Sequence, residues 1–319
     1  MSEQLVTVVV RKRDEQGEGV VVLELADPQG RPLPAFAAGA HVDLHLQPGL
    51  VRQYSLCGDP ASSASYRLGV LKDPASRGGS LAVHAQLQPG CEIHISRPRN
   101  HFPLAPEARR SILIGGGIGI TPMLAMAYAL TAADSDFELH YCGRSRARSA
   151  FLDELAQVPF ARRVQTHFDD EAPAQQLDLV RVLGQPQPGT HVYVCGPAGF
   201  MDWVIGQAIA QGYADDHVHR EYFRLAVDAS GGSFEVQAAR SGKTVQVAEG
   251  QSIVEALSAA GIKIDISCEQ GVCGTCLCDV LEGLPDHRDV YLTDEEKQAN
   301  DQILVCCSRA KSQKLVLDI

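Results

Sequence analysis

Four cysteines near the end of the chain constrain its fold more than any other feature. Cys268, Cys273 and Cys276 form a Cys-x4-Cys-x2-Cys loop, and Cys306 follows after a long intervening segment. This is the spacing of a plant-type 2Fe–2S site, in which one tight loop supplies three thiolates and a separate segment supplies the fourth. A zinc site is the alternative, but zinc ligands favour paired Cys-x2-Cys or His spacings. The spacing therefore predicts a 2Fe–2S cluster and an electron-transfer function.

The sequence gives no sign of export or membrane insertion. Its first residues lack the basic, apolar and cleavage regions of a signal peptide, and no apolar run is long enough to span a bilayer. We therefore expect a cytoplasmic protein whose thiols stay reduced. Five further cysteines are interpreted as small core residues: Cys57, Cys91, Cys142, Cys278 and Cys307.

The charge of the chain is unevenly distributed. The formal net charge of −11 argues against nucleic acid as a partner. Residues 226–319 hold 15 acidic and 8 basic side chains, so most of the acidic excess lies on the cysteine-bearing segment. One interpretation is a solvated acidic face. The other is a surface that steers docking to a basic partner.

The patterning of the 319 residues changes twice, which fits the two or three domains that this length allows. Residues 1–105 hold short alternating runs at 6–11, 19–25, 41–46, 66–70 and 92–96, separated by turns such as Pro48-Gly49. This pattern predicts a closed antiparallel β-barrel. Residues 106–226 alternate buried strands with helical stretches at 123–131, 150–157 and 199–211. That alternation predicts an α/β domain with a parallel sheet.

A flexible linker is expected at residues 227–233, where Ala229 to Gly232 are small and Gly/Ser-rich. The last domain, residues 234–319, opens with a predicted hairpin around Gly242. A helix follows, in which Ser252 as N-cap and Glu255 complete a capping box. The cysteine loop comes next, and Gly271 and Gly274 let its backbone amides approach the inorganic sulfur atoms.

A glycine-rich loop connects the first strand of the second domain to a helix. It occupies residues 115–119 and is not the standard G-x-G-x-x-G pattern. Free amides at the start of a helix favour an anion, and a plain structural turn is the alternative. We interpret the loop as a pyrophosphate site. Its candidate residues are Gly115, Gly116, Gly117, Gly119, Thr121 and Pro122.

Two segments of the barrel carry groups suited to a cofactor. Residues 52–55 are extended, and alternation places Arg52 and Tyr54 on one side. The second segment, residues 72–80, has basic side chains and a Gly-Gly-Ser turn that opens a helix, an arrangement that suits a phosphate. The alternative for both segments is that these are ordinary surface side chains that bind no cofactor. The candidates are Arg52, Tyr54, Ser55, Lys72, Gly78, Gly79 and Ser80.

Three motifs, taken in order, resemble the ferredoxin–NADP reductase superfamily. They are Arg-x-Tyr-Ser at 52–55, Gly-Gly-Gly-x-Gly-x-Thr-Pro at 115–122 and Cys-Gly-Pro at 195–197. With the cysteine motif behind them, the whole chain resembles the phthalate dioxygenase reductase family. These proteins are the reductase components of two-component Rieske oxygenases, including those of vanillate O-demethylase and phenoxybenzoate dioxygenase. The resemblance implies a multidomain α+β and α/β fold: an FMN-binding barrel, an NAD-binding domain and a C-terminal β-grasp ferredoxin domain.

The resemblance also implies roles for single residues. Arg52, Tyr54 and Ser55 would hold the flavin ring and ribityl chain, while residues 78–80 would hold its phosphate. Phe223 would stack on the flavin, and an ordinary core aromatic is the alternative. Cys195, Gly196 and Pro197 would lie near the nicotinamide. The candidate catalytic residues are therefore Ser55, Cys195 and Phe223.

The choice of nucleotide depends on two loops. Arg144, Arg146 and Arg148 would suit the 2′-phosphate of NADPH. Asp169 and Asp170 would instead accept hydrogen bonds from the ribose hydroxyls of NADH. The family that this chain resembles uses such an arginine-rich stretch with NADH, so NADH is the prediction.

The predicted function is an NADH-dependent reductase that passes electrons through FMN and the 2Fe–2S cluster to a terminal Rieske oxygenase, in aromatic-acid catabolism. The chain has no His₂Cys₂ motif for a Rieske centre, so the oxygenase would be a separate polypeptide. The alternatives are a stand-alone flavin or ferric reductase, a reductase for a di-iron hydroxylase, and a redox sensor. A sensor would need an effector domain beyond these three modules.

Overall fold

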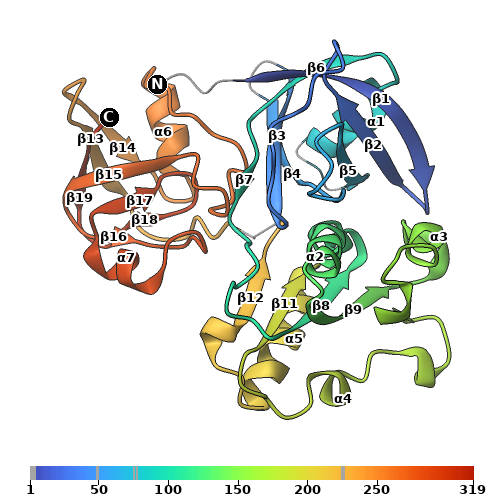
Figure 1. Ribbon diagram of the computed structural model, residues 1–319. Coiled ribbons are helices and arrows are strands. Elements are labelled where there is room, and N and C mark those ends of the chain that lie inside the picture. Colours follow the sequence, from blue (N-terminus) through green and yellow to red (C-terminus); the bar gives the residue numbers. More distant parts are fainter. Residues whose placement is uncertain (1–4, 48–49, 75, 77, 224–226) are drawn as a thin grey trace. The chain divides into compact units, whose positions relative to one another are not determined.

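The computed structural model describes residues 5–47, 50–74, 76, 78–223 and 227–319 (Figure 1). The expected turn at Pro48-Gly49 and the basic residue Arg77 lie outside the described residues. The chain forms two compact units, Met1–Phe223 and Arg224–Ile319, called here the N-terminal and C-terminal units. The finer division at residue 105 and the linker bounds of 227–233 stay predictions.

The first sheet of the N-terminal unit is antiparallel, as the alternating runs predict. Its strand order is β4-β3-β6-β1-β2-β5, with β7 paired to β3. An isolated bridge between Leu56 and Leu68 joins the end of β4 to β5, so the sheet closes on itself. Its core is made of inward-facing aliphatic side chains, and the short helix α1 follows β5. The elements are β1 (Val6–Gln16), β2 (Val20–Ala26), β3 (Ala40–Gln47), β4 (Leu50–Ser55), β5 (Tyr66–Leu71), α1 (Gly79–Gln86), β6 (Glu92–Ile95) and β7 (Arg99–Asn100).

The second sheet of this unit is parallel, with the order β10-β9-β8-β11-β12. The central strand β8 is buried on both faces, since Leu113 belongs to one core cluster and Ile112 and Ile114 to the other. The chain runs from β8 to β9 in one direction and later to β11 in the other, which makes the β8–β11 edge a topological switch point. The strands are β8 (Arg110–Gly116), β9 (Asp136–Gly143), β10 (Val164–Phe168), β11 (Thr190–Cys195) and β12 (Val218–Glu221).

Helices α2 (Ile120–Ala132) and α5 (Ala198–Ala210) occupy the stretches where the sequence predicts them. The helix expected at residues 150–157 is much shorter, covering only Leu152–Leu155 (α3). It begins after Phe151, whose φ of 64° is left-handed and cannot be part of a right-handed helix. Helix α4 (Leu179–Leu183) has no counterpart in the sequence prediction.

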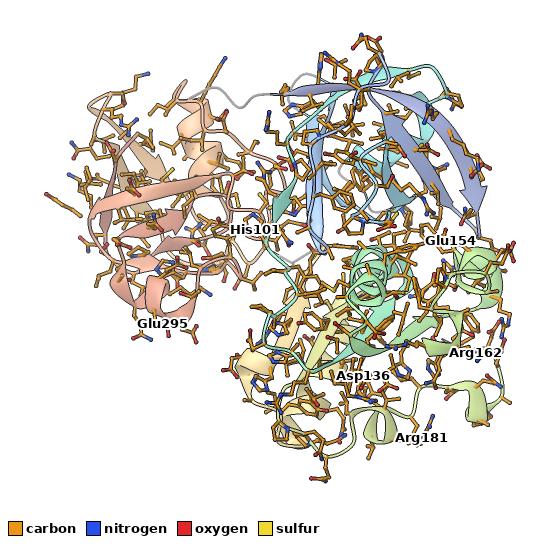
Figure 2. All side chains as sticks on the ribbon, in the orientation of Figure 1. His101, Asp136, Glu154, Arg162, Arg181 and Glu295 are labelled. Carbon is orange, nitrogen blue, oxygen red and sulfur yellow. The ribbon has the colours of Figure 1, made fainter. Side chains whose placement is uncertain are left out.

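The barrel and the parallel sheet are joined by specific contacts. Arg67 of β5 forms two hydrogen bonds with Glu154 of α3, at 2.8 and 2.6 Å, and Glu154 is labelled in Figure 2 beside the barrel strands. A side chain at Gly69 would meet Thr121 at 2.8 Å and the Phe151 ring at 3.0 Å, so β5 lies directly against the start of α2. These contacts fix the barrel relative to the glycine-rich loop.

The C-terminal unit contains a mixed sheet of order β14-β13-β19-β15-β17, in which β13 and β19 are parallel. The predicted hairpin is present, and α6 begins with the predicted capping box of Ser252 and Glu255. Ile253 and Leu257 of α6 pack into the core of the sheet. The elements are β13 (Phe234–Ala238), β14 (Lys243–Val247), α6 (Ile253–Ala259), β15 (Leu277–Glu282), β16 (Pro285–Asp286), α7 (Asp294–Ala299), β17 (Gln302–Leu304), β18 (Arg309–Ala310) and β19 (Lys314–Leu317).

Candidate functional site

The glycine-rich loop lies directly against the segment that follows β11. Strands β8 and β11 run in register, with Gly115 opposite Cys195. A Cβ at Gly119 would lie 2.2 Å from the Cys195 carbonyl oxygen, and one at Gly116 would lie 2.8 Å from the Phe200 ring. The contact therefore requires glycine. The short 3₁₀ turn η1 (Gly117–Gly119) leads into α2, so the loop presents backbone amides at a helix start.

The two remaining candidates of this loop play different parts. Thr121 is buried, and its hydroxyl donates to the Ile118 carbonyl at 2.9 Å, which fixes the first turn of α2. Pro122 lacks a backbone N–H, so it adds no unpaired donor to the first turn of α2. On the facing side, a Cβ at Gly196 would lie 3.1 Å from Gly116 Cα. The next residue, Pro197, is the N-cap of α5. Two helix starts thus meet at the switch point of the sheet.

A second cradle lies in the barrel at the start of α1. Gly78 is the N-cap with a φ of 92°, and no side chain of the described residues caps the first turn. A Cβ at Gly79 would lie 2.3 Å from Arg52 Cγ, so the arginine stem lies across the helix start. The Ser80 hydroxyl accepts from the Asp73 amide at 3.1 Å, and Lys72 is exposed nearby. The arrangement combines backbone amides and basic side chains, which suits a phosphate.

Strand β4 carries the other barrel candidates on opposite faces. Tyr54 pairs with Val42 and packs against the barrel core, where burial raises the pKa of its phenol. Ser55 faces the other way and is buried. Arg52 and Tyr54 therefore share one face, as alternation predicts, while Ser55 points to the parallel sheet.

Ser55, Cys195 and Glu221 meet where the barrel joins the parallel sheet. The Ser55 hydroxyl donates to Glu221 Oε2 at 3.1 Å, and Cys195 stands opposite Glu221 in the pairing of β11 with β12. Burial raises the pKa of Glu221 to about 8, and the Ser55 hydrogen bond opposes that rise. Burial and the neighbouring Glu221 carboxyl raise the pKa of the Cys195 thiol well above its usual value. Both shifts favour the neutral form of the group.

Glu221 is a residue whose chemical role the sequence reasoning missed. In the segment of residues 221–223, the sequence analysis assigns a role only to Phe223. One signal could have identified Glu221: it lies at the carboxyl end of a parallel strand, and polar side chains gather at these strand ends in open α/β sheets. Phe223 itself is 38% exposed, so it is not a core aromatic.

The arginine-rich loop after β9 and the acidic loop after β10 are adjacent. The Asp169 amide donates to the Gly143 carbonyl at 3.0 Å. Arg146 donates through Nε to Glu171 at 2.6 Å, and its guanidinium lies 4.7 Å from the centre of the Phe168 ring. Arg144 and Asp170 are both exposed. Glu171, which the sequence reasoning did not consider, thus partly neutralises the arginine cluster.

In the C-terminal unit, the four predicted ligands are buried together. The thiol of Cys268 interacts with those of Cys273 and Cys306, and the thiol of Cys306 also interacts with that of Cys276. Within the described residues, no three His, Cys, Asp or Glu side chains converge closely enough to hold one metal ion. The thiols instead form a chain of neighbours, as four ligands shared between two irons would.

The loop around these thiols has the backbone geometry that the cluster needs. Gly271 and Gly274 adopt φ values of 73° and 72°, and the Gln270 amide donates to Cys268 Sγ at 3.3 Å. A Cβ at Gly274 would lie 2.3 Å from the Tyr291 ring, and one at Gly271 would lie 2.5 Å from Cys307 Sγ. Amides directed at sulfur and a tightly covered loop fit a 2Fe–2S cluster.

The two extra cysteines beside the ligands face different surroundings. Cys278 hydrogen-bonds to the Cys276 carbonyl at 3.6 Å from within β15, and Cys307 hydrogen-bonds to the Leu304 carbonyl at 3.8 Å. The thiols of Cys306 and Cys307 also contact each other. The choice of Cys306 over Cys307 as the fourth ligand therefore stays a prediction.

Two models of known protein families match separate parts of the chain. Residues 236–311 match the 2Fe-2S iron-sulfur cluster binding domain, and residues 113–205 match the oxidoreductase NAD-binding domain. The first match includes all four thiols, and the second includes the facing loops of β8 and β11. Among the described residues, no helix has both the length and the apolar character needed to cross a membrane.

Relatives match along the whole chain. Vanillate O-demethylase oxidoreductase of Pseudomonas sp. (strain HR199 / DSM 7063) is 50% identical over 99% of this chain and 100% of its own length. The carnitine monooxygenase reductase subunit of Escherichia coli (strain K12) is 40% identical over 99% of both chains. The solved structure of phthalate dioxygenase reductase, described as a modular structure for electron transfer from pyridine nucleotides to [2Fe-2S], is 37% identical over 99% of this chain and 98% of that one, with a TM-score of 0.76. The chain therefore belongs to the phthalate dioxygenase reductase family.

Proposed function

We propose that this protein is the NADH-dependent reductase component of a Rieske non-haem iron oxygenase system. The barrel would hold a flavin, FMN in this proposal, which would supply the conversion of two-electron hydride chemistry from NADH into single-electron transfer to the 2Fe–2S cluster. The observation that carries the proposal is the meeting of the barrel, through Ser55, with the nucleotide sheet, through Cys195 and Glu221.

The residues of the barrel bind and orient the flavin in this proposal. Backbone amides of residues 78–80 at the start of α1 and the Arg52 guanidinium hold the phosphate, with Lys72 nearby. Tyr54 and Phe223 contact the ring. Hydride transfer needs no general base, so these residues contribute stacking, orientation and exclusion of water.

The parallel sheet positions the nucleotide. The amides of residues 115–119 and the start of α2 receive the pyrophosphate, and the start of α5 at Pro197 faces them. The buried Ser55 and Cys195 and the half-buried Glu221 border the place where the nicotinamide meets the flavin in this proposal. The raised pKa of the Glu221 carboxyl favours its protonated form, which adds no negative charge there and donates a hydrogen bond.

NADH rather than NADPH is supported by the pairing of Arg146 with Glu171 at 2.6 Å. A 2′-phosphate would have to compete with that carboxylate for the guanidinium. The exposed Asp170 remains available to ribose hydroxyls. We therefore assign Arg144 and Asp170 to the adenosine end of the nucleotide.

The electron acceptor in this proposal is a terminal Rieske oxygenase on a separate polypeptide. The oxygenase selects the substrate, which fits relatives that serve vanillate and carnitine oxygenases at 50% and 40% identity. The higher identity to the vanillate reductase supports a role in aromatic-acid catabolism. We also propose a cytoplasmic location and the domain limits 1–105, 106–226, 227–233 and 234–319.

Cofactor analysis tests this assignment directly. Acid extraction followed by chromatography, together with iron and sulfide analysis, should give about one FMN, two irons and two sulfides per chain. Recovery of FAD, or of about one zinc without sulfide, would contradict it.

A further inference from the structure

Residues 228–232 precede the first strand of the C-terminal unit, and their composition predicts a flexible segment. The structure instead attaches them to that unit through a buried arginine. Arg309 is only 2% exposed, and it donates to the carbonyls of Gly231 and Gly232 at 3.4 and 3.0 Å. It also donates to the carbonyls of Gln251 and Ala248, and its guanidinium lies 5.1 Å from the centre of the Phe234 ring.

A second arginine holds the beginning of the same segment. Arg288 donates to the Asp228 carbonyl at 2.5 Å, and its other nitrogens bind Asp286 at 2.9 and 2.6 Å. The Asp228 carboxylate accepts from the Ser230 amide at 2.9 Å, which folds the segment locally. Gly231 lies between the two guanidinium groups, since its Cβ position would be 3.4 Å from Arg309 Nε and 3.6 Å from an Arg288 nitrogen.

The burial of Arg309 makes this attachment costly to break. A buried guanidinium must keep its hydrogen-bond acceptors, because leaving a buried charge unpaired is strongly unfavourable. Two of its carbonyl partners belong to the segment itself. Arg309 follows the predicted ligand Cys306 by three positions. Its strand β18 pairs with β16, where Arg309 stands opposite Asp286, the residue that Arg288 binds.

We infer that Arg288 and Arg309 clamp residues 228–232 onto the 2Fe–2S unit and thereby keep the connection to the flavin-bearing unit short. The N-terminal unit ends at Phe223, so residues 224–227 alone separate it from the clamped segment. This inference rests on the proposed function, because it concerns electron transfer from flavin to cluster. The clamp acts by limiting the length of free chain between the two units.

Chain geometry gives the size of the expected effect. From Phe223 to Asp228 the backbone can extend by at most about 18 Å, and release of the clamped residues up to Ser233 doubles this to about 36 Å. The effective concentration of tethered partners falls as roughly the −3/2 power of length. Doubling the connection should therefore slow electron transfer to the cluster about threefold.

The test compares three variants of the full-length holoprotein. The double variant Arg288→Gln/Arg309→Met removes the clamp, and Met keeps the buried site apolar. A second variant keeps both arginines but has five Gly/Ser residues inserted between Val227 and Asp228. The control, Arg240→Gln, removes an exposed bidentate pair with Asp318 in the same unit, at 2.9 and 2.7 Å, away from this segment.

Two measurements are made on each protein. Elastase cleavage after Ala229, followed by mass spectrometry, should be at least about tenfold faster in the clamp variant than in the wild type or control, because proteolysis requires local release of the chain. In anaerobic rapid mixing with NADH, cluster reduction should slow about threefold in both the clamp and the insertion variants, with flavin reduction unchanged.

Equal cleavage of wild type and clamp variant would overturn the clamp, and unchanged cluster reduction in both altered proteins would overturn its role in electron transfer. If the clamp variant does not fold, cleavage of the single variant Arg288→Gln tests whether the segment is clamped. The insertion variant then tests the role of the clamp in electron transfer. A wild type whose flavin is not reduced by NADH would instead refute the proposed function, and the cleavage result would still stand.

Discussion

Glu221 shows how a single residue at the meeting point of two sheets acquires unusual properties. Burial raises the pKa of its carboxyl to about 8, against the Ser55 hydrogen bond that favours the ionised form. The folded protein therefore binds one more proton than the unfolded chain between about pH 4.5 and pH 8. The stability that depends on this proton is present at low pH and is lost as the pH rises through 8.

The variant Glu221→Gln, which cannot ionise, isolates this effect. Between pH 6 and pH 9 the wild type should lose about 1–3 kcal/mol of unfolding free energy relative to the variant. Denaturant titrations of both proteins at the two pH values measure the difference. A constant difference across this range would show that the Glu221 carboxyl titrates normally.

The cysteine assignment makes a second prediction at this scale. Serine at Cys268, Cys273, Cys276 or Cys306 should remove or destabilise the cluster and leave the flavin bound, because the two groups lie in different units. Cys278→Ala and Cys307→Ala should keep the visible absorbance of the cluster. Loss of the cluster in Cys307→Ala, together with its retention in Cys306→Ser, would show that Cys307 is the ligand.

Sequence spacing predicts single residues well where chemistry fixes the spacing. The four thiols that the spacing selects are all buried in the C-terminal unit, three of them in a tight loop with two left-handed glycines, and their role as cluster ligands stays a prediction. Glu221 and Glu171 could not be recognised in this way. Their surroundings are created by strands and loops that are distant in the chain, so their burial and partners exist only in the folded protein.

At the scale of elements, the glycine-rich loop packs directly against the end of strand β11, and the two segments together form the predicted nucleotide site. A methyl group at Gly119 would lie 2.2 Å from the Cys195 carbonyl oxygen, and backbone on both sides prevents relief. Gly119→Ala should therefore weaken NADH binding at least about tenfold and destabilise the fold by about 1–3 kcal/mol, as overpacking does.

Gly206→Ala is the matched control, because this position lies within α5 and nothing stands within 4 Å of its Cβ. It should stabilise the protein by up to about 1 kcal/mol through helix propensity and leave binding unchanged. Titration of flavin fluorescence with a non-reducing NAD analogue compares the two variants. Unchanged affinity in Gly119→Ala would mean that the loop is not part of the nucleotide site.

Elements with a strong local signal could be predicted, and elements set by tertiary contacts could not. The capping box of Ser252 and Glu255 is encoded within four residues, so α6 begins where expected. The helix expected at 150–157 is cut short by Phe151, whose left-handed backbone is held by packing against β5. Closure of the barrel, which the alternating strands predict, is made by the bridge between Leu56 and Leu68.

At the scale of the whole molecule, the acidic excess on the C-terminal unit predicts electrostatic attraction of a basic partner protein. Several acids gather on and before α7, including Asp286, Asp289, Asp294, Glu295 and Glu296, and Figure 2 labels Glu295 on this helix. Asp289 is buried and accepts from the amides of Tyr291 and Leu292, so it serves the fold rather than the surface. Asp286 is paired with Arg288, so the exposed Asp294, Glu295 and Glu296 are the acids expected to steer a basic partner.

Raising the salt concentration from low to about 0.5 M, where the Debye length is about 4 Å, should slow reduction of the oxygenase. Flavin reduction by NADH should change much less, because it does not depend on protein–protein encounter. Charge reversal of Glu295 and Glu296 should lower the rate measured at low salt. An unchanged rate would identify these residues as a solvated face and leave the reductase assignment intact.

The central claim is that electrons pass from NADH to the flavin and then to the cluster. Anaerobic rapid mixing of wild type and Cys306→Ser with NADH, followed at flavin and cluster wavelengths, tests this order. The wild type should show flavin bleaching followed by cluster bleaching and should reduce cytochrome c. The variant should bleach its flavin at the wild-type rate but lose nearly all cytochrome c reduction. A folded variant that cannot bleach its flavin, or one that keeps full cytochrome c reduction, would contradict the proposed electron path.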